Sequence, residues 1–580
     1  MKPPFIQEIS EKIWREKYRA GPDEHDIEQS WHRVAHAVAS VEPENSSEWA
    51  TRFLELMRGF RFLPGGRILA GAGTDREVTL LNCFVMGPID DSMEGIFDAL
   101  KEGALTMQQG GGVGYDFSTL RPSGTVARSS GTIASGPVSF MKIWDAMCAT
   151  LLSTGSRRGA MMASLSCSHP DIETFVTAKY DAQALRHFNL SVQITDDFMR
   201  AVEADTAWPL RFEDKTLRRV PARELWQKIL RAAYDTAEPG VLFVDQINRE
   251  NNLAYQEHIT TTNPCGEVPL PPYGACDLGS LNLPCFVHDA FEQNARLDSD
   301  ALMQATMLAV RFLDNVIDLS RFPLPEQADR AHHTRRIGLG ITGLADALIM
   351  LGHRYDSDAA RETARDIMKT VCRTAYRAST ALAAEKGSFP DLNTNAYLQS
   401  PFIRRLPADT RDAIANHGIR NSHLLAIAPA GTISLLANNI SSGIEPVFAA
   451  RTRRTVIDSN SRPHEYELAD HALQLWAMRN PSEPLPPAFT TAWDIEPEAQ
   501  LKMQATLQVF VDNAISKTIN VSPDYSQNEF EQLYHRAHRL RLKGCTVFRP
   551  NPVTGSILKP EGQSSEPAPV HCCDVHREAD

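Results

Sequence analysis

Apolar residues recur at every third or fourth position in three stretches of the chain, which is the spacing of one face of an amphipathic helix. Two of the stretches are residues 225–236 and 302–319. The third is residues 1–62, where the apolar positions include Ile13, Trp14, Tyr18, Trp31, Val34 and Val38. The pattern predicts a small helical region at the start of the chain and two helices that each pack on one side.

Shorter signals predict the elements between these helices. The apolar run at residues 81–85 reads as a buried strand that carries Cys83. The sequence Asp-Asp-Ser-Met that follows at 90–93 predicts the start of a helix with Ser92 as its N-cap. At 427–436, a proline, small residues and two hydroxyls precede an apolar run, which predicts a helix N-terminus suited to phosphate. From these residues alone, an ordinary capped helix is the alternative.

The loop Asn263-Pro264-Cys265-Gly266-Glu267 carries the densest candidate chemistry. Pro264 disfavours a helix, and an extended backbone would direct the side chains of Asn263, Cys265 and Glu267 to the same side. Gly266 lets the chain bend just past the sulfur. We therefore expect a thiol flanked by an amide and a carboxylate. A structural cysteine beside a solvated glutamate is the alternative interpretation.

Composition narrows the class of protein. The chain has 580 residues, of which 42% are hydrophobic and 23% charged, as in soluble globular proteins. Its formal net charge of −13 argues against a broad nucleic-acid-binding face, although a small nucleotide needs only a local group of N–H donors or arginines. No signal-peptide pattern and no apolar window of about 18 residues is present, so we expect a cytoplasmic protein without a membrane span.

The ten cysteines do not form a zinc pattern, because no paired Cys-x-x-Cys spacing occurs. In a reducing compartment, cysteines that come together are expected to be catalytic, redox-active or metal-binding. The glycines at 338–343 fit a dinucleotide-binding pattern, but the polar, basic residues 330–336 before them do not form the strand that this motif requires. We therefore reject a Rossmann fold.

Taken together, these motifs resemble the catalytic subunit of ribonucleotide reductases. The resemblance rests on the loop around Cys265, on Cys276 eleven residues later and on Cys83 far upstream. The segments 269–274 and 279–283 are most similar to the class II, adenosylcobalamin-dependent branch. The similarity extends from about residue 63 to residue 549.

The resemblance implies an α/β fold, a ten-stranded barrel over residues 63–549 with Cys265 on a central finger loop. Residues 1–62 would form the helical region, too short for the ATP-binding activity domain of some relatives. Residues 550–580 would form a flexible redox tail that carries Cys572 and Cys573. The part before these cysteines is rich in Pro, Gly, Ser and Glu. The two tail cysteines are adjacent, whereas the family's usual pair is spaced.

The resemblance also implies roles for five residues. Cys265 would carry a thiyl radical, Glu267 would act as general base and Asn263 would orient the substrate. Cys83 and Cys276 would deliver the reducing equivalents and end as a disulfide, which the tail would reduce again.

The remaining implied sites bind nucleotides. Substrate would contact Asn82, Gly112, Pro429, Ala430, Gly431, Thr432, Ile433 and Ser434. A deoxynucleotide effector would contact Asp91, Arg121, Arg157 and Arg158. The chain departs from the family at Gly66, where many relatives place a serine.

The implied cofactor is adenosylcobalamin. No tyrosine follows Tyr534, whereas class I subunits receive their radical through paired tyrosines in this region. No Asp-x-His-x-x-Gly motif offers a histidine to cobalt, so the sequence identifies no metal ligand.

The expected partners are a ribonucleotide, with a diphosphate favoured over a triphosphate, and a thioredoxin-like protein or small dithiol. We also expect a homodimer, and no nucleic acid polymer. Two alternatives stay open: a class I subunit that depends on a separate metalloprotein, and a nucleotide-sensing regulator without activity.

Overall fold

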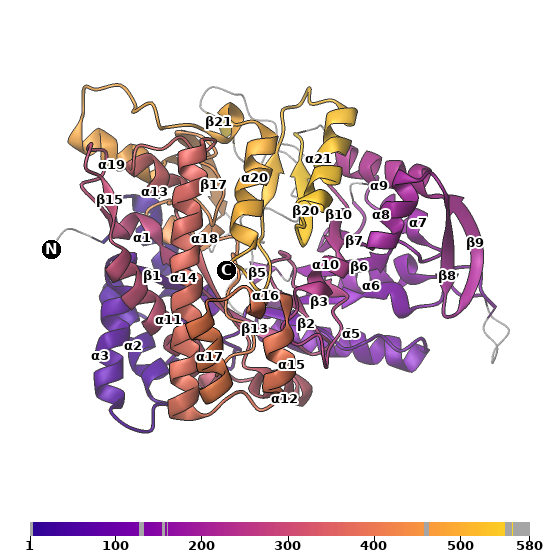
Figure 1. The fold of residues 1–580 in the computed structure, drawn as a ribbon, viewed down its shortest axis with the longest axis horizontal. Coiled ribbons are helices and arrows are strands. Elements are labelled where there is room, and N and C mark those ends of the chain that lie inside the picture. The colour runs from indigo at the N-terminus through magenta and orange to yellow at the C-terminus, as the bar shows by residue number, and fades with distance from the viewer. Residues whose placement is uncertain are drawn as a thin grey trace.

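The computed structural model describes residues 4–126, 133–153, 157–158, 160–181, 183–457, 463–550 and 559–560. Its centre is one large sheet (Figure 1). Along the hydrogen-bonded path the strands are β1 (Phe62–Pro64), β13 (Ala275–Asn282), β2 (Cys83–Val85), β3 (Gly112–Asp116), β6 (Met161–Ser166), β7 (Phe188–Ile194), β10 (Gly240–Phe243), β20 (Gly544–Phe548) and β19 (Thr518–Asn520), with β16 (Ile337–Thr342) paired to β13.

The sheet consists of parallel runs joined by antiparallel pairs. Strands β2, β3, β6, β7 and β10 are parallel neighbours, whereas β13 pairs antiparallel with β2, and β20 pairs antiparallel with β10. Parallel bridges from Leu339 to Leu425 and from Ile427 to Ile515 continue the path from β16 towards β19. This arrangement is the ten-stranded α/β barrel expected from the sequence.

The apolar patterns of the sequence correspond to helices in the structure. The first part of the chain contains α1 (Glu8–Ile13), a π-helical turn (Trp14–Tyr18), α2 (Ile27–Ala39) and α3 (Ser46–Met57). The two predicted central helices are α9 (Ala222–Thr236) and α11 (Ser299–Leu319). The predicted N-cap is confirmed, since the Ser92 side chain accepts a hydrogen bond from Gly95 N–H at the start of α5 (Met93–Gln108).

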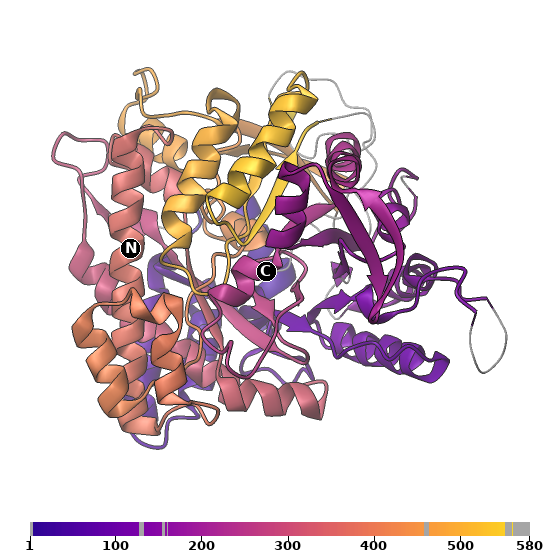
Figure 2. The ribbon, with the colours of Figure 1, turned by 45° about the vertical axis from the view of Figure 1, so that its right-hand side comes forward.

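The main remaining helices surround the barrel, and α21 packs against α9 (Figure 2). None of the helices in the described part of the chain is long and apolar enough to cross a membrane. The main remaining helices are α6 (Pro137–Thr150), α8 (Asp196–Glu203), α12 (Pro325–Thr334), α13 (Leu344–Met350), α14 (Asp358–Lys386), α17 (Ala408–His417), α18 (Gly431–Leu436), α19 (His471–Arg479), α20 (Pro497–Gln508) and α21 (Gln527–Arg539).

Smaller sheets of two or three strands lie outside the ten-stranded sheet. The hairpin of β8 (Ala207–Phe212) and β9 (Lys215–Pro221) is at the end of the molecule opposite α1–α3 (Figure 1). Strands β17 (Arg451–Ile457) and β18 (Pro463–Ala469) form a second hairpin, to which β21 (Lys559–Pro560) adds. A further pair is β14 (Val287–His288) with β15 (Arg296–Leu297).

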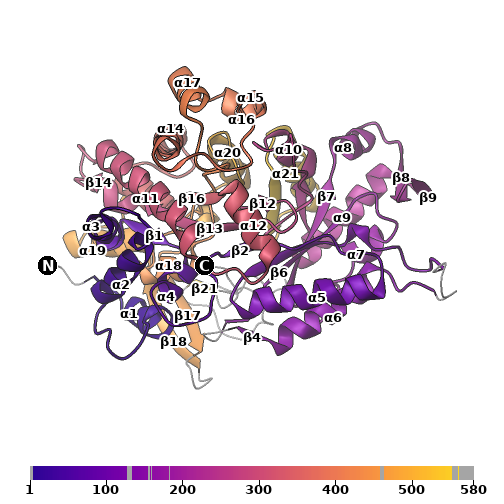
Figure 3. The same ribbon diagram turned by 90° about the horizontal axis from the view of Figure 1, so that it is seen from below.

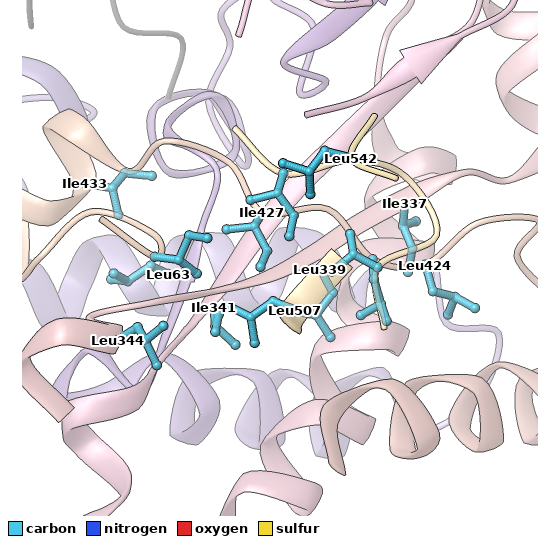
Figure 4. Close-up of a cluster of buried hydrophobic side chains, with 14 of the residues drawn as sticks. Leu63, Ile337, Leu339, Ile341, Leu344, Leu424, Ile427, Ile433, Leu507 and Leu542 are labelled. Carbon is cyan, nitrogen blue, oxygen red and sulfur yellow. The ribbon is translucent and has the colours of Figure 1, made fainter. Parts of the chain in front are cut away.

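An apolar core fills the space between the barrel strands and the helices on one side (Figure 4). The three alternate residues Ile337, Leu339 and Ile341 of β16 are fully buried in it. Their neighbours in the cluster come from β1, α13, α18, α20 and connecting segments: Leu63, Leu344, Leu424, Ile427, Ile433, Leu507 and Leu542. The glycine-spaced segment 338–343 is therefore mostly a buried barrel strand, which agrees with rejection of a Rossmann motif.

Candidate active site

A short hairpin carries the Asn-Pro-Cys-Gly-Glu loop across the barrel strands. Its strands are β11 (Thr261–Thr262) and β12 (Pro269–Leu270), paired antiparallel. The hairpin lies so close to β3 that a Cβ atom on Gly114 would be 1.9 Å from the carbonyl oxygen of Thr262. Because glycine has no Cβ, Gly114 permits this approach. We call the hairpin and its tip, residues 261–270, the finger loop.

The tip of the finger loop is a turn and not the extended segment predicted from the sequence. Gly266 N–H donates to the carbonyl oxygen of Asn263 at 3.1 Å, and Gly266 has φ +82°. Pro264 occupies the second position of this turn, where its fixed φ is favourable. As a result, Asn263 and Glu267 are fully buried, whereas Cys265 is half-buried and lines a cavity. The expected bend at Gly266 is confirmed.

Cys83 and Cys276 lie opposite each other on neighbouring strands. In the antiparallel pairing of β2 with β13, they are direct Cα partners. Residues in such positions have Cα atoms about 4.5–5.5 Å apart, which is within the range that a disulfide spans. Both residues are buried thiols in this structure. The strand pairing thus places two thiols at bonding range although they are remote in sequence.

The finger loop contacts this cysteine pair directly. Asn263 Nδ2 donates to Cys83 Sγ at 3.1 Å, and the Cys83 thiol donates to Glu267 Oε1 at 3.6 Å. Burial, followed by the nearby Glu267 carboxylate, raises the pKa of the Cys83 thiol well above its usual range. Charge on Cys276 or Cys265 would raise it further. Three sulfurs and one carboxyl group therefore interact within one site.

Burial also raises the pKa of the other groups in the site. The pKa of Glu267 is raised by burial and lowered less by its hydrogen bonds to Asn263 and Cys83. Its Oε2 atom has no hydrogen-bond partner among the described residues. Burial likewise raises the pKa of Cys276, whose thiol donates to the carbonyl oxygen of Asp277 at 3.2 Å. Both cysteines are consequently held as neutral thiols near neutral pH.

The cavity beside Cys265 has a volume of about 430 Å³. Across it lies the start of α18, where Pro429, Gly431 and Ser434 line the wall. The Ser434 hydroxyl is buried and has no hydrogen-bond partner in the described part of the chain, so it is available to a ligand. The predicted helix start is confirmed at Gly431.

Main-chain hydrogen bonds connect the finger loop to the segment that leads into α18. Ala514 N–H donates to the carbonyl oxygen of Glu267 at 2.8 Å, and Ile427 N–H donates to that of Ala514 at 3.1 Å. Ser516 N–H then donates to the carbonyl oxygen of Ile427 at 2.9 Å. The two faces of the cavity are thus joined through the backbone.

Family comparisons agree with this geometry. Residues 81–548 match the family described as ribonucleotide reductase, barrel domain, and residues 5–77 match ribonucleotide reductase, all-alpha domain. The chain belongs to the ribonucleotide reductase family.

Among curated relatives of this reductase, a vitamin B12-dependent ribonucleoside-diphosphate reductase of Mycobacterium tuberculosis (strain CDC 1551 / Oshkosh) is 40% identical over 565 residues, which cover 94% of this chain and 78% of the relative. A protein of the same name from Thermoplasma acidophilum is 38% identical over 534 residues, 89% of this chain and 67% of the relative. The ribonucleoside-diphosphate reductase large subunit of vaccinia virus (strain Copenhagen) is 28% identical over 559 residues, with coverages of 86% and 71%.

The other predicted substrate residues of the reductase occupy different environments. Gly112 lies beneath the finger loop, where a Cβ atom would be 3.1 Å from Pro264 Cγ. The side chain of Asn82 is buried, and neither of its polar atoms has a partner among the described residues. Ala430 N–H donates to Ser442 Oγ at 2.8 Å. Thr432 and Ile433 are buried within α18.

The predicted effector residues of the reductase are described in part. Arg121 Nε donates to Asp91 Oδ2 at 2.7 Å, so these two residues form one ion pair. Arg157 and Arg158 form β5, which pairs with β4 (Leu152–Ser153). The side chains of both arginines, and the tail cysteines Cys572 and Cys573, lie outside the described part of the structure.

Sequence reasoning missed two polar groups in the cavity wall. The Lys517 ammonium is buried and bonds to Glu445 Oε2 at 2.5 Å and Gln500 Oε1 at 3.0 Å. Asn189 on β7 reaches the finger loop through a side-chain hydrogen bond. The alternation of Asn189, Ser191 and Gln193 with apolar residues was a usable signal, since it marks one polar face of a strand. No local pattern identifies Lys517.

Proposed function

We propose that this reductase converts ribonucleoside diphosphates to 2′-deoxyribonucleoside diphosphates with adenosylcobalamin as cofactor. The relatives that are 38–40% identical carry the name vitamin B12-dependent ribonucleoside-diphosphate reductase. The observation that supports the chemistry most strongly is the direct pairing of Cys83 with Cys276 beneath a loop that presents Cys265 to a cavity. In this proposal the half-buried sulfur of Cys265 serves radical transfer, and the two buried thiols serve reduction.

The cavity is suited to the adenosyl part of the cofactor. Its volume lies in the range of small-ligand pockets, and Phe448 and Phe548 contribute apolar wall to it. Gln504 Oε1, also in the wall, is a buried acceptor without a hydrogen-bond partner in the described part of the chain. Among the described residues no group of three or more His, Cys, Asp or Glu could hold a metal ion. When bound, adenosylcobalamin supplies a carbon-centred radical.

In the proposed reaction, Cys265 gives up its hydrogen atom and then, as a thiyl radical, takes the 3′-hydrogen of the ribose. Glu267 accepts the proton of the 3′-hydroxyl. One thiol of the pair Cys83 and Cys276 protonates the departing 2′-hydroxyl, which leaves as water. The raised pKa of both thiols supports this role, because a thiolate has no proton to donate.

The electron balance closes on the cysteine pair. Replacement of the 2′-hydroxyl by hydrogen requires two electrons and two protons, and oxidation of two thiols to one disulfide supplies both. The 3′-hydrogen returns to the ribose from Cys265, which would then take back the hydrogen atom that it first gave up. Asn263, which donates to Cys83, would orient the substrate amid these groups.

The phosphate groups of the substrate are proposed to bind at the start of α18. The buried Ser434 hydroxyl and the N–H groups of a helix start suit a diphosphate. Asn82 and Gly112 on the finger-loop side, and the segment from Pro429 to Ser434, form the proposed substrate site.

We propose that Asp91, Arg121, Arg157 and Arg158 bind a deoxynucleotide effector at a homodimer interface. Helices α5 and α6 lie side by side on one face (Figure 3). The apolar side chains of Met93, Phe97 and Leu105 on α5 are exposed, with 60% exposure for Met93, which supports burial by a second copy.

The proposed reductant of the Cys83 and Cys276 disulfide is the pair Cys572 and Cys573, itself reduced by a thioredoxin-like protein or small dithiol. A tether makes the exchange with the buried disulfide intramolecular.

Anaerobic incubation with each ribonucleoside diphosphate, a dithiol and adenosylcobalamin tests the proposal. We expect formation of the deoxynucleotide, and none with Cys265→Ser. Activity that appears only with a separate metalloprotein would assign the chain to class I, and nucleotide binding without turnover under either condition would identify a regulator.

A further inference from the structure

The peptide that leads into Cys265 is held by a side chain from another strand. Asn189 Nδ2 donates to the carbonyl oxygen of Pro264 at 2.7 Å. Asn189 stands on β7, where its Cα partner on β6 is Met162, and it lines the same cavity as Cys265. The donor therefore belongs to the barrel wall and the acceptor to the finger loop.

The other main-chain hydrogen bonds of the tip act at different points. Gly266 N–H and Val268 N–H both bond to Asn263, so they close the loop on itself. Ala514 N–H bonds to the carbonyl oxygen of Glu267, on the far side of Cys265. Asn189 and Ala514 thus attach the tip to the barrel on the two sides of the sulfur.

Such an attachment has a functional reason. Gly266, with φ +82°, gives the tip conformational freedom directly after Cys265. Hydrogen-atom transfer requires reacting atoms about 3–3.5 Å apart, and a misplacement of about 1 Å costs roughly 100-fold in rate. A fixed peptide before Cys265 keeps the sulfur aligned both when it gives up a hydrogen atom and when it takes one.

The surroundings of Asn189 favour this role over simple packing. Asparagine is depleted in strands, and Asn189 is less buried than the rest of β7. Gln193, on the same face of β7, has its own partner in Ser164 Oγ at 3.0 Å. The Asn189 amide instead bonds to a backbone carbonyl 75 positions away in the chain.

We propose that Asn189 is a positioning residue that fixes the direction in which the Cys265 thiol leaves the finger loop. This inference rests on the proposed function for its catalytic consequence, whereas its effect on the geometry of Cys265 can be measured without any cofactor.

The first experiment measures the rate at which iodoacetamide alkylates Cys265, followed by mass spectrometry of the peptide that contains it, in protein without nucleotide or cofactor. Asn189→Ala removes the hydrogen bond, and Asn189→Asp keeps the shape but removes the donor. We expect both variants to react about five-fold faster than wild type, because the loss of one hydrogen bond frees the tip that holds the half-buried sulfur of Cys265. Ser191→Ala, which changes the same face of β7 without touching this bond, should react at the wild-type rate.

The second experiment compares steady-state constants in the presence of cofactor. Both Asn189 variants should lose about 10- to 100-fold in kcat. Their KM for the diphosphate should stay close to that of wild type, because Asn189 aligns the sulfur and does not hold the phosphates. A packing defect would instead lower the melting temperature and change both constants.

The inference is overturned if Asn189→Asp, with a wild-type melting temperature, is alkylated at Cys265 at the wild-type rate. It is also overturned if Ser191→Ala accelerates alkylation as much as the Asn189 variants do. An inactive wild-type protein whose Asn189 variants still show faster alkylation would refute the proposed function and leave the positioning role intact.

Discussion

Replacement of Glu267 by glutamine should have opposite effects on activity and on stability. The substitution keeps the shape of the side chain and removes its ability to accept a proton. Glu267 is fully buried, its pKa is raised by that burial, and it accepts a hydrogen bond from the Cys83 thiol. Loss of a general base slows catalysis by about 10²–10⁴-fold, or about 3–5 kcal/mol in activation free energy.

The stability effect follows from the direction of the pKa shift. A carboxyl group with a raised pKa in the folded state binds its proton more tightly when folded. Its contribution to stability is therefore complete below the unfolded pKa of about 4.3 and is lost as pH rises through the folded pKa. Between those two values, wild type loses about 1.4 kcal/mol per pH unit at this site. Glu267→Gln does not titrate and avoids the loss.

Asp277, on barrel strand β13, offers a matched control. It is fully buried, burial raises its pKa well above its usual range, and neither of its carboxylate oxygens has a partner among the described residues. Asp277→Asn should thus give the same kind of stabilisation at pH 8. Its side chain has no proposed part in proton transfer, so turnover should be retained.

The assays are thermal unfolding of the protein without ligands between pH 5 and pH 8, and deoxynucleotide formation with cofactor and dithiol. In wild type, kcat should rise with pH through the raised pKa of Glu267. Turnover of Glu267→Gln within about ten-fold of wild type would refute its role as base. A lower melting temperature than wild type at pH 8 would refute the account of its burial.

Three further predictions concern the cysteine pair, the finger loop and the core. Cys276→Ser should abolish multiple turnover, because the serine hydroxyl cannot form a disulfide, and nucleotide binding, measured by calorimetry, should persist. Sustained turnover would contradict the pairing with Cys83. Gly114→Ala should displace the finger loop, since its Cβ would lie 1.9 Å from the Thr262 oxygen, and normal kcat would exclude that contact. Leu339→Ala should lower the free energy of unfolding by about 2–5 kcal/mol in denaturant titrations, whereas a loss below about 1 kcal/mol would show that the core closes around the cavity.

Local signals in the sequence were sufficient for the helices and their caps. The spacing of apolar residues located α9 and α11, and Ser92 located the start of α5. These features depend on residues within a few positions of one another, so sequence patterns capture them.

Features that depend on remote segments were outside the reach of local patterns. The pairing of Cys83 with Cys276 requires the register of β2 against β13, and only the family resemblance indicated it. The finger-loop tip was predicted as extended because Pro264 disfavours a helix, yet proline equally favours a turn when Gly266 can adopt a positive φ. The contact of Asn189 with Pro264 joins separate parts of the barrel and left only a weak trace, a polar residue at an alternate strand position.

The backbone link from Glu267 through Ala514 to Ile427 has a consequence for evolutionary change in this protein. It works as a spacer of fixed length between the proposed site of the sugar chemistry and the proposed phosphate site. Because these hydrogen bonds join backbone atoms, substitution of side chains along the link leaves the spacing unchanged, and the sequence there can vary. Proline at position 514 or 427 would remove one of its N–H donors and alter the span itself.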